Sequence, residues 1–161
     1  MEKKILLLGN PKLYEISVSV EKDELSQLVA VIQDMHDTLI AFREKYHAGR
    51  AIAAPQIGIQ KRILYMYIDC PTVFINPVLE PVGNEQMEIL DDCMSFPNLI
   101  VKVKRYKKCK LKYRDMDWNE QEIILEGALS ELLQHEYDHL DGVLATMRAI
   151  DQRSFFIKQE P

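Results

Sequence analysis

A His-Glu-x-x-His pattern near the C-terminal end, formed by His135, Glu136 and His139, most constrains what this chain of 161 residues can fold into. The pattern lies in a predicted helix, where residues four apart lie about 6 Å apart along the axis on one face. The two imidazoles can then bind one metal ion, and Glu136 can take a proton from a water held there. Two histidines on a helix also suit ordinary core or surface positions, so the pattern alone leaves both interpretations open.

The composition is that of a folded globular protein, with 47% hydrophobic and 28% charged residues. A chain of this length can bury one hydrophobic core, so we expect residues 1–161 to form a single domain. The formal net charge of −5 argues against a specific nucleic-acid partner. One basic run, residues 102–112, alternates with apolar residues and predicts the exposed face of strands, with a polyanion-binding patch as the alternative.

Targeting signals are missing from the sequence. The apolar run at residues 5–8 is too short for a signal peptide, and no stretch approaches the roughly 20 apolar residues of a membrane span. The 3 cysteines are scattered and do not resemble a disulfide framework. We therefore expect a cytoplasmic protein without a membrane partner, and the sequence does not predict an oligomeric state.

Two long helices are predicted towards the two ends of the chain. The first begins near Asp23, with Asp23 or Ser26 as its cap, and continues to Tyr46 or His47. The second covers residues 127–140. Apolar residues at helical spacing predict the buried positions, which are Leu25, Leu28, Val29, Ile32, Met35, Leu39 and Phe42 in the first helix and Leu129, Leu132, Leu133 and Leu140 in the second.

The segments between the helices predict strands by their alternation, at residues 62–68, 72–79, 86–90, 99–106, 108–114 and 121–125. We expect residues 99–106 and 108–114 to pair with each other, and Asn76-Pro77 to lie at a sheet edge or a bend. The predicted fold class is α+β, with mostly antiparallel strands packed around the C-terminal helix that carries the metal motif, plus a long N-terminal helix.

A catalytic metal usually has three protein ligands, so the pattern requires a third. The metzincin continuation fails, because Ala145 occupies the position of the third histidine. The downstream Glu160 lies next to the C-terminus, which is a poor platform for a rigid ligand. An upstream thiolate suits zinc or ferrous iron, but spacing alone does not separate Cys93 from Cys70 or Cys109.

Three segments, in this order, resemble the motifs of the peptide deformylases. Residues 49–56 (GRAIAAPQ) resemble the family's Gly-x-Gly-Leu-Ala-Ala-x-Gln, although local composition alone favours a plain connection there. Residues 91–95 (DDCMS) resemble Glu-Gly-Cys-Leu-Ser, and residues 134–139 (QHEYDH) match Gln-His-Glu-x-Asp-His. Weaker likenesses at both ends extend the resemblance over nearly the whole chain.

The resemblance implies a metal-dependent hydrolase that removes the N-formyl group from the formyl-methionine of nascent polypeptides, which it would meet at the ribosome. Glu136 would be the general base and acid, and Gln56 and the backbone N–H of Met94 would donate hydrogen bonds to the oxyanion. The metal would be one divalent ion, ferrous iron in the cell with zinc or nickel as replacements. The implied ligands are Cys93, His135 and His139.

Candidate substrate-binding residues lie close to the motifs, and they are Gly49, Ala51, Ile52, Phe96 and Leu132. The chain also departs from the family pattern. Ala51 replaces a Gly in a loop expected to line the substrate channel, Arg50 adds a charge beside it, and Asp91-Asp92 replace Glu-Gly. Extra negative charge near Cys93 would disfavour a thiolate.

These departures leave two alternatives to deformylation of peptides open. One is hydrolysis of another small N-formyl or N-acyl amide, and the other is a metal-binding homologue without turnover. A further prediction concerns Asp138, which we expect behind the metal site in a pair with Arg105. A solvated position on the helix is the alternative for Asp138.

Overall fold

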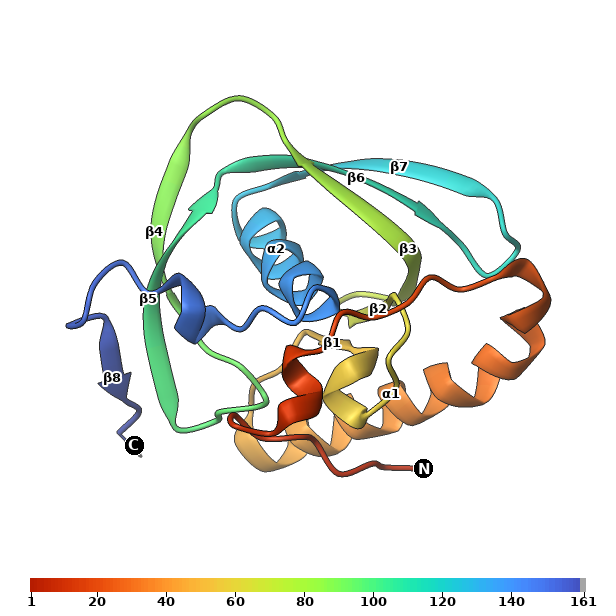
Figure 1. The fold of residues 1–161 in the computed structure, drawn as a ribbon, viewed down its shortest axis with the longest axis horizontal. Helices are drawn as coiled ribbons and strands as arrows, with labels where there is room; N and C mark the ends of the chain where they lie inside the picture. The colour runs from red at the N-terminus through yellow and green to blue at the C-terminus, as the bar shows by residue number, and fades with distance from the viewer. Residues whose placement is uncertain (160–161) are drawn as a thin grey trace.

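The computed structural model describes residues 1–159, and Glu160 lies outside them. It has an α+β fold with two antiparallel sheets and two long helices, α1 (Leu25–Tyr46) and α2 (Ala128–Leu140) (Figure 1). Helix α2 lies inside the curve of the strands, and α1 runs along the side of the molecule near the first two strands (Figure 1). The predicted fold class and both helices are therefore confirmed.

The larger sheet has the strand order β1-β2-β3-β6-β7, and the smaller has the order β4-β5-β8. The strands of the larger sheet are β1 (Ala51–Ala53), β2 (Ile63–Tyr67), β3 (Pro71–Pro81), β6 (Lys108–Arg114) and β7 (Glu120–Glu126). Those of the smaller sheet are β4 (Gln86–Asp91), β5 (Leu99–Tyr106) and β8 (Phe155–Ile157). Short 3₁₀ turns lie at Pro11–Tyr14, Lys22–Glu24, Ala54–Ile57 and Ala145–Arg148.

The predicted pairing of residues 99–106 with 108–114 is wrong, because β5 and β6 belong to different sheets. β5 pairs with β4 and β8, whereas β6 pairs with β3 and β7. The chain crosses between the sheets at Lys107, whose N–H donates to the carbonyl of Glu85 and whose carbonyl accepts from Gly127 N–H, both at 2.9 Å. Strands adjacent in sequence often pair, but a corner residue with outside partners overrides that tendency.

The bend predicted at Asn76-Pro77 is confirmed, but the edge position is wrong. β3 lies in the middle of the larger sheet, between β2 and β6. Its register with β6 shifts between Ile75 and Val78, and Asn76 has a φ of 49°. The Asn76 side chain also bonds both the N–H and the carbonyl of Val20. A bulge therefore allows a proline within a central strand.

The start of α1 and two predicted core positions also differ from expectation. Neither Asp23 nor Ser26 caps α1. The N-cap residue is Glu24, which makes no side-chain hydrogen bond to the helix; its carboxylate accepts from Glu21 N–H at 2.6 Å in the preceding 3₁₀ turn. Val29 is 61% exposed, since the buried face follows Leu28, Met35 and Leu39.

Leu129 in the first turn of α2 is exposed, and Ser130 is buried beside it. The Ser130 hydroxyl donates to the carbonyl of Tyr106 at 2.8 Å, which ties this turn to the end of β5. The first turn of α2 is therefore attached to the core by a polar contact, which the spacing of apolar residues does not predict.

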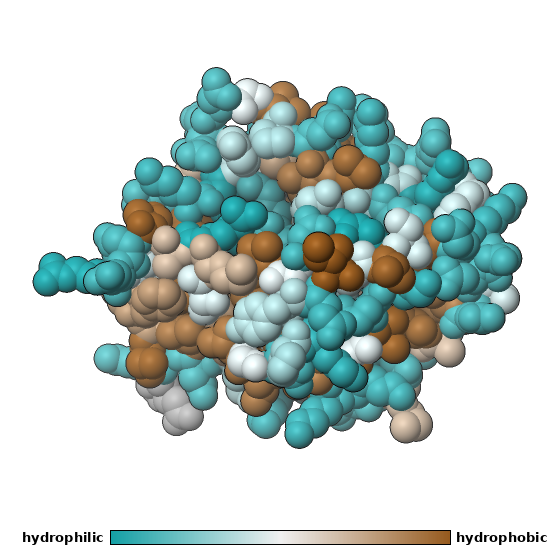
Figure 2. All heavy atoms as spheres, viewed as in Figure 1, coloured by the Kyte–Doolittle hydropathy of each residue, from teal (hydrophilic) through white to brown (hydrophobic). Residues whose placement is uncertain are grey.

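The lysines of the basic run at residues 102–112 lie on the outer face of strands, as predicted, whereas Arg105 in the same run is buried. Val101, Val103, Cys109 and Leu111 are fully buried between its lysines. Hydrophilic residues cover most of the face in Figure 2, and apolar side chains gather near β8, where Phe155, Phe156 and Ile157 are exposed. In the described part of the chain, no helix has the length and apolar character to span a membrane.

Candidate metal centre and active site

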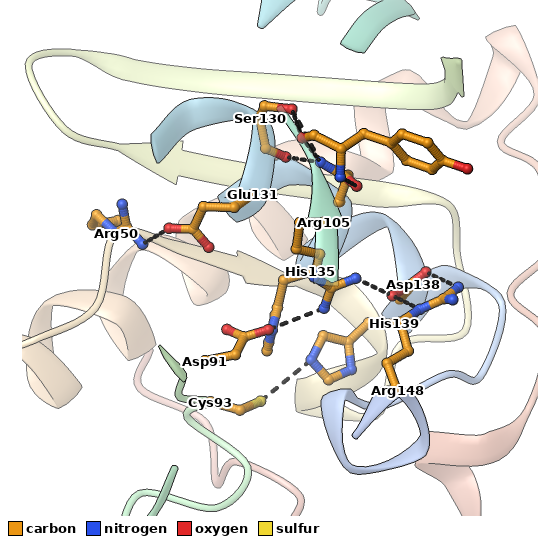
Figure 3. A network of polar contacts seen from close by, with 12 residues as sticks. Arg50, Asp91, Cys93, Arg105, Ser130, Glu131, His135, Asp138, His139 and Arg148 are labelled. Carbon is orange, nitrogen blue, oxygen red and sulfur yellow. Dashed lines mark hydrogen bonds and ion pairs between the residues drawn. The ribbon is translucent and has the colours of Figure 1, made fainter. Parts of the chain in front are cut away.

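Cys93, His135 and His139 come together at the centre of the fold, although 46 residues separate Cys93 from His139. One ligand atom from each lies within 4.8 Å of the other two, and all three side chains are buried. Cys93 Sγ is 3.4 Å from His139 Nε2 (Figure 3). The histidines lie on one face of α2, and Cys93 is in the loop that follows β4.

The other two cysteines lie elsewhere. Cys70 is exposed in the turn before β3, and Cys109 is buried in the core with Leu111 and Leu125. Two donors face the sulfur of Cys93: Ser95 N–H at 3.4 Å and Gln56 Nε2 at 3.6 Å. The thiolate is the form of cysteine that binds metals.

Asp91 fixes the orientation of His135. The Nδ1 of His135 lies 2.8 Å from Asp91 Oδ2, and Arg105 donates to the same oxygen at 3.0 Å (Figure 3). Burial alone lowers the pKa of His135, but the charges of Asp91 and Cys93 raise it well above its usual value. Burial raises the pKa of Asp91, but the charges and hydrogen bonds of His135 and Arg105 outweigh burial, so the pKa is lowered overall. Asp91 thus has two buried partners, His135 and Arg105.

His139 is held as a neutral imidazole. Burial, followed by the charge of His135, lowers its pKa well below the usual value. Its Nδ1 is buried and has no hydrogen-bond partner among the described residues, while Nε2 points at Cys93. A neutral imidazole next to a thiolate is the donor type that divalent transition metals prefer.

Glu136 follows the first histidine and is 5% exposed. Its Oε2 has no hydrogen-bond partner within residues 1–159. Burial raises its pKa to about 7, with the charge of His135 opposing the rise. A sulfur, two imidazoles and an unpartnered carboxylate oxygen fit a divalent metal with a water to be activated beside it.

An ion network supports α2 from behind, as predicted for Asp138 and Arg105. Arg105 is 3% exposed and donates to Asp138 Oδ2 at 2.6 Å as well as to Asp91. Arg148 also pairs with Asp138 (Figure 3). Arg105 thus links the carboxylate that orients His135 to the helix that carries both histidines. The pairing of Asp138 is confirmed, and its solvated alternative is wrong.

Gln56 reaches the same site from the 3₁₀ turn after β1 and is 1% exposed. Its Oε1 accepts from Ala53 N–H at 2.9 Å, and its Nε2 donates to Ser95 Oγ at 3.1 Å. The amide is therefore fixed with its N–H side towards Cys93. The segment at residues 49–58 is more than a plain connection, because it delivers this side chain.

A cavity of about 290 Å³ opens beside the metal cluster and is lined by Cys93 and Glu136. Gly49, Ala51, Met94 and Leu132 also line it. Its remaining lining residues are Phe42, Tyr46, Ala48, Arg50, Asp91, Asp92, Pro97, Glu131, His135 and Lys158.

Ile52 and Phe96, which were expected near the substrate, do not line this cavity. Ile52 is fully buried in a core cluster that includes Leu39 of α1. Phe96 packs in a third core cluster with Leu13 and Val101. Ile52 follows the cavity residue Ala51 and Phe96 precedes the cavity residue Pro97, but both side chains lie in the core.

The altered motif residues fit without backbone strain. Ala51 in β1 pairs with Met66 in β2. Neither Ala51 nor Asp92 is among the described residues with positive φ. Three contributors to the site were not predicted from sequence: Ser95, Arg148 and the orienting role of Asp91. The position of Asp91 at the end of a strand, two residues before Cys93, was the available signal.

Comparison with known proteins agrees with this site. The family model described as Polypeptide deformylase matches residues 2–155. Peptide deformylase 1 of Prochlorococcus marinus is 36% identical over 165 residues, covering 95% of this chain and 83% of the relative. The peptide deformylase of Pseudothermotoga lettingae is 35% identical over 161 residues, covering 99% and 90%.

Solved structures agree as well. The crystal structure of peptide deformylase from Thermotoga maritima superposes with a TM-score of 0.85 at 32% identity, covering 94% of this chain and 99% of that one. The fold and the Cys-His-His cluster define a metal-dependent hydrolase. The chain belongs to the polypeptide deformylase family, whose members remove the N-formyl group from nascent peptides.

Proposed function

We propose that residues 1–161 act as one catalytic domain that deformylates the formyl-methionyl end of nascent polypeptides in the cytoplasm, at the ribosome. The observation that carries the proposal is the unpartnered Oε2 of buried Glu136 beside the cluster of Cys93, His135 and His139. A carboxylate without a partner in a buried site is costly unless a ligand or reacting group satisfies it. Water and a formyl amide are the groups that this constellation suits.

The residues that would hold the metal are Cys93, His135 and His139. One soft thiolate with two imidazoles suits ferrous iron, zinc and nickel, and we propose ferrous iron in the cell. A divalent metal bound there would lower the pKa of a water molecule and polarise the formyl carbonyl.

Glu136 acts as the base and then as the acid. Its carboxylate takes a proton from the attacking water, whose oxygen forms a bond to the formyl carbon. The bond from that carbon to the α-amino nitrogen of the first residue then breaks, and Glu136 returns the proton to this leaving amine. Water and the formyl peptide thus become formate and a free N-terminal amine. A pKa of about 7 suits a group that must both accept and donate.

Gln56 and the backbone N–H of Met94 stabilise the oxyanion that develops on the formyl oxygen. The Gln56 amide is held by Ala53 and Ser95 before any substrate arrives, so little reorganisation is required. Gly49, Ala51 and Leu132 contact the substrate, since they line the cavity next to Glu136.

An anaerobic assay tests this proposal. The protein is purified without oxygen, its metal content is measured, and formate release from formyl-Met-Ala-Ser is followed. We expect iron at one ion per chain and formate release. Turnover of small N-formyl or N-acyl amides but not of the peptide would favour the alternative substrate class. A metal-loaded protein that releases no formate from either would favour a binding protein without turnover.

A further inference from the structure

Arg148 pairs with a carboxylate on the helix that carries both histidines. Its Nε lies 2.5 Å from Asp138 Oδ2 and its NH2 lies 2.9 Å from Asp138 Oδ1, so the pair uses both carboxylate oxygens (Figure 3). Bidentate pairs of this kind are strong and directional. The Arg148 side chain is 47% exposed, whereas that of Asp138 is 10% exposed. The ion network behind the metal site therefore reaches the surface at Arg148.

The backbone of Arg148 is attached to a strand of the smaller sheet. Ala149, the next residue, forms a β-bridge with Val103 of β5, and the same strand carries Arg105. Both arginines that pair with Asp138 therefore approach α2 from the side of this strand.

Arg105 makes one contact with each of two carboxylates. Its NH1 lies 2.6 Å from Asp138 Oδ2, and its NH2 lies 3.0 Å from Asp91 Oδ2. An arginine and a carboxylate frequently pair through two parallel bonds instead. That arrangement is blocked on Asp138, because Arg148 NH2 already occupies Oδ1. The second amino group of Arg105 is therefore left for Asp91.

Asp91 carries this arrangement to a proposed metal ligand. Its Oδ2, which accepts from Arg105, also lies 2.8 Å from His135 Nδ1. The Nε of Arg105 is buried and has no hydrogen-bond partner among the described residues, so only the two carboxylates hold this guanidinium by polar contacts. A shift of Arg105 towards Asp138 would thus remove a partner from Asp91 and loosen the His135 ring.

We propose that Arg148 is a positioning residue for the metal centre. By occupying the second oxygen of Asp138, it keeps Arg105 on Asp91 and thereby keeps His135 Nε2 oriented towards the metal. Arg148 does not line the cavity next to Glu136, so it acts through other side chains. This inference rests on the proposed metal ligands and requires no turnover.

Metal affinity, measured by competition with a chelator, tests the proposal. Arg148→Met should weaken metal binding about tenfold, as is typical when support for a histidine ligand is lost. Arg148→Lys should also weaken it, because an ammonium group cannot occupy both oxygens of Asp138 in the plane of the carboxylate. Unchanged affinity in the methionine variant would overturn the proposal. Full affinity in the lysine variant would overturn it too, because charge alone would then suffice.

Arg153→Met is the matched control, since Arg153 is exposed in the same C-terminal segment. It should bind metal as tightly as the unmodified protein. An equal loss of affinity in this variant would assign the effect to the general charge of the segment and contradict a role for Arg148.

Chemical rescue examines the geometry of the contact. A cavity of about 270 Å³ is lined by Arg148, Arg105 and Asp138, so a small cation can reach the carboxylate once the arginine side chain is removed. Guanidinium chloride, far below the concentrations that unfold proteins, should restore metal affinity to Arg148→Ala. Methylammonium chloride at the same concentration should not. Equal effects of the two salts, or no rescue by guanidinium, would contradict the proposal.

The visible spectrum of the cobalt-loaded protein separates positioning from a general loss of stability. Because the ligand-field bands of cobalt report ligand geometry, they should shift in Arg148→Met at full loading and stay unchanged in Arg153→Met. An unchanged spectrum with a lower free energy of unfolding would leave Arg148 a structural role only. If the unmodified protein binds metal but releases no formate, the proposed activity fails, while these affinities and spectra still decide the role of Arg148.

Discussion

His135 Nδ1 lies 2.8 Å from Asp91 Oδ2, which leaves Nε2 as the nitrogen available to a metal ion. Asp91 is held in turn by Arg105, and Arg105 by Asp138 on the same helix as His135. The orientation of His135 thus depends on a connected network of buried charged side chains. Loss of a partner of this kind typically costs about 10–100-fold in metal affinity or activity.

Asp91→Asn should lower metal affinity about 10–100-fold, because the amide orients the ring but supplies no negative charge to the imidazole. Competition with a chelator, followed by metal analysis, measures the change. Asp92→Asn is the matched control, since Asp92 is an exposed neighbour whose carboxylate is 3.8 Å from Lys158. Equal affinities in the two variants would exclude Asp91 from metal binding.

Glu136→Gln should keep the metal and lower kcat about 10²–10⁴-fold, because the attacking water loses its proton acceptor. Formate release is compared with metal content in the same sample. Glu122→Gln, at an exposed position on β7, should leave kcat unchanged. Full activity in the Glu136 variant would remove this carboxylate from the proposed mechanism.

Gln56→Glu should lower kcat about 10²–10³-fold while the fold is retained. The new carboxylate can still accept from Ala53 N–H, but it no longer donates from the position of Nε2. Rate constants and thermal unfolding are measured together. Gln86→Glu, exposed on β4, is the control. A loss of stability without a loss of kcat would assign Gln56 a structural role only.

Arg105→Met should destabilise the protein by about 3–5 kcal/mol, because Asp91 and Asp138 would remain buried without this partner. Urea unfolding of the metal-free protein measures the free energy directly. Lys104→Met, exposed on the same strand, should have little effect. A result as mild as this control would mean that Arg148 and water replace the missing charge.

Stability should fall at alkaline pH, in part through Cys109. Burial raises the pKa of this thiol above its usual value of 9.0, against a smaller lowering by Ser130. Below about pH 9 the thiol is protonated in both states, so it adds no pH dependence. Above it the unfolded thiol ionises first, which favours unfolding until the folded pKa is passed.

Cys109→Ala should therefore flatten the loss of unfolding free energy above about pH 9, although the smaller side chain lowers stability at every pH. Urea titrations at each pH supply the slope. Cys70→Ala, which removes an exposed thiol, should keep the original slope. Parallel curves for the Cys109 variant would show that its thiol ionises equally in both states.

Local patterns predicted the local parts of the fold and the site. The spacing of His135 and His139 is a property of one helix, and the boundaries of β5 and β6 follow from alternation within each strand. The pairing of these strands depended on the corner at Lys107, whose partners are 22 and 20 residues away in sequence. Such long-range contacts are not encoded in periodicity.

The third metal ligand was also difficult to predict from local sequence patterns. Cys93 lies in the loop after β4 and Cys109 lies within β6, and from the sequence only family resemblance separated them. Of the pocket residues inferred from neighbouring motifs, Gly49, Ala51 and Leu132 line the cavity, whereas Ile52 and Phe96 lie in the core. Sequence proximity fixes the backbone near a site but not the direction of each side chain.

The ligands of the proposed metal come from both halves of the architecture, with Cys93 at the end of the smaller sheet and His139 on the helix within the curve of the strands. An ion bound between them closes a chain loop across 46 residues, which exists only in the folded protein. Its binding free energy is then also folding free energy. Scarcity of the metal would therefore reduce the amount of folded enzyme as well as the activity of each molecule, so that supply of the ion and lifetime of the protein are thermodynamically linked.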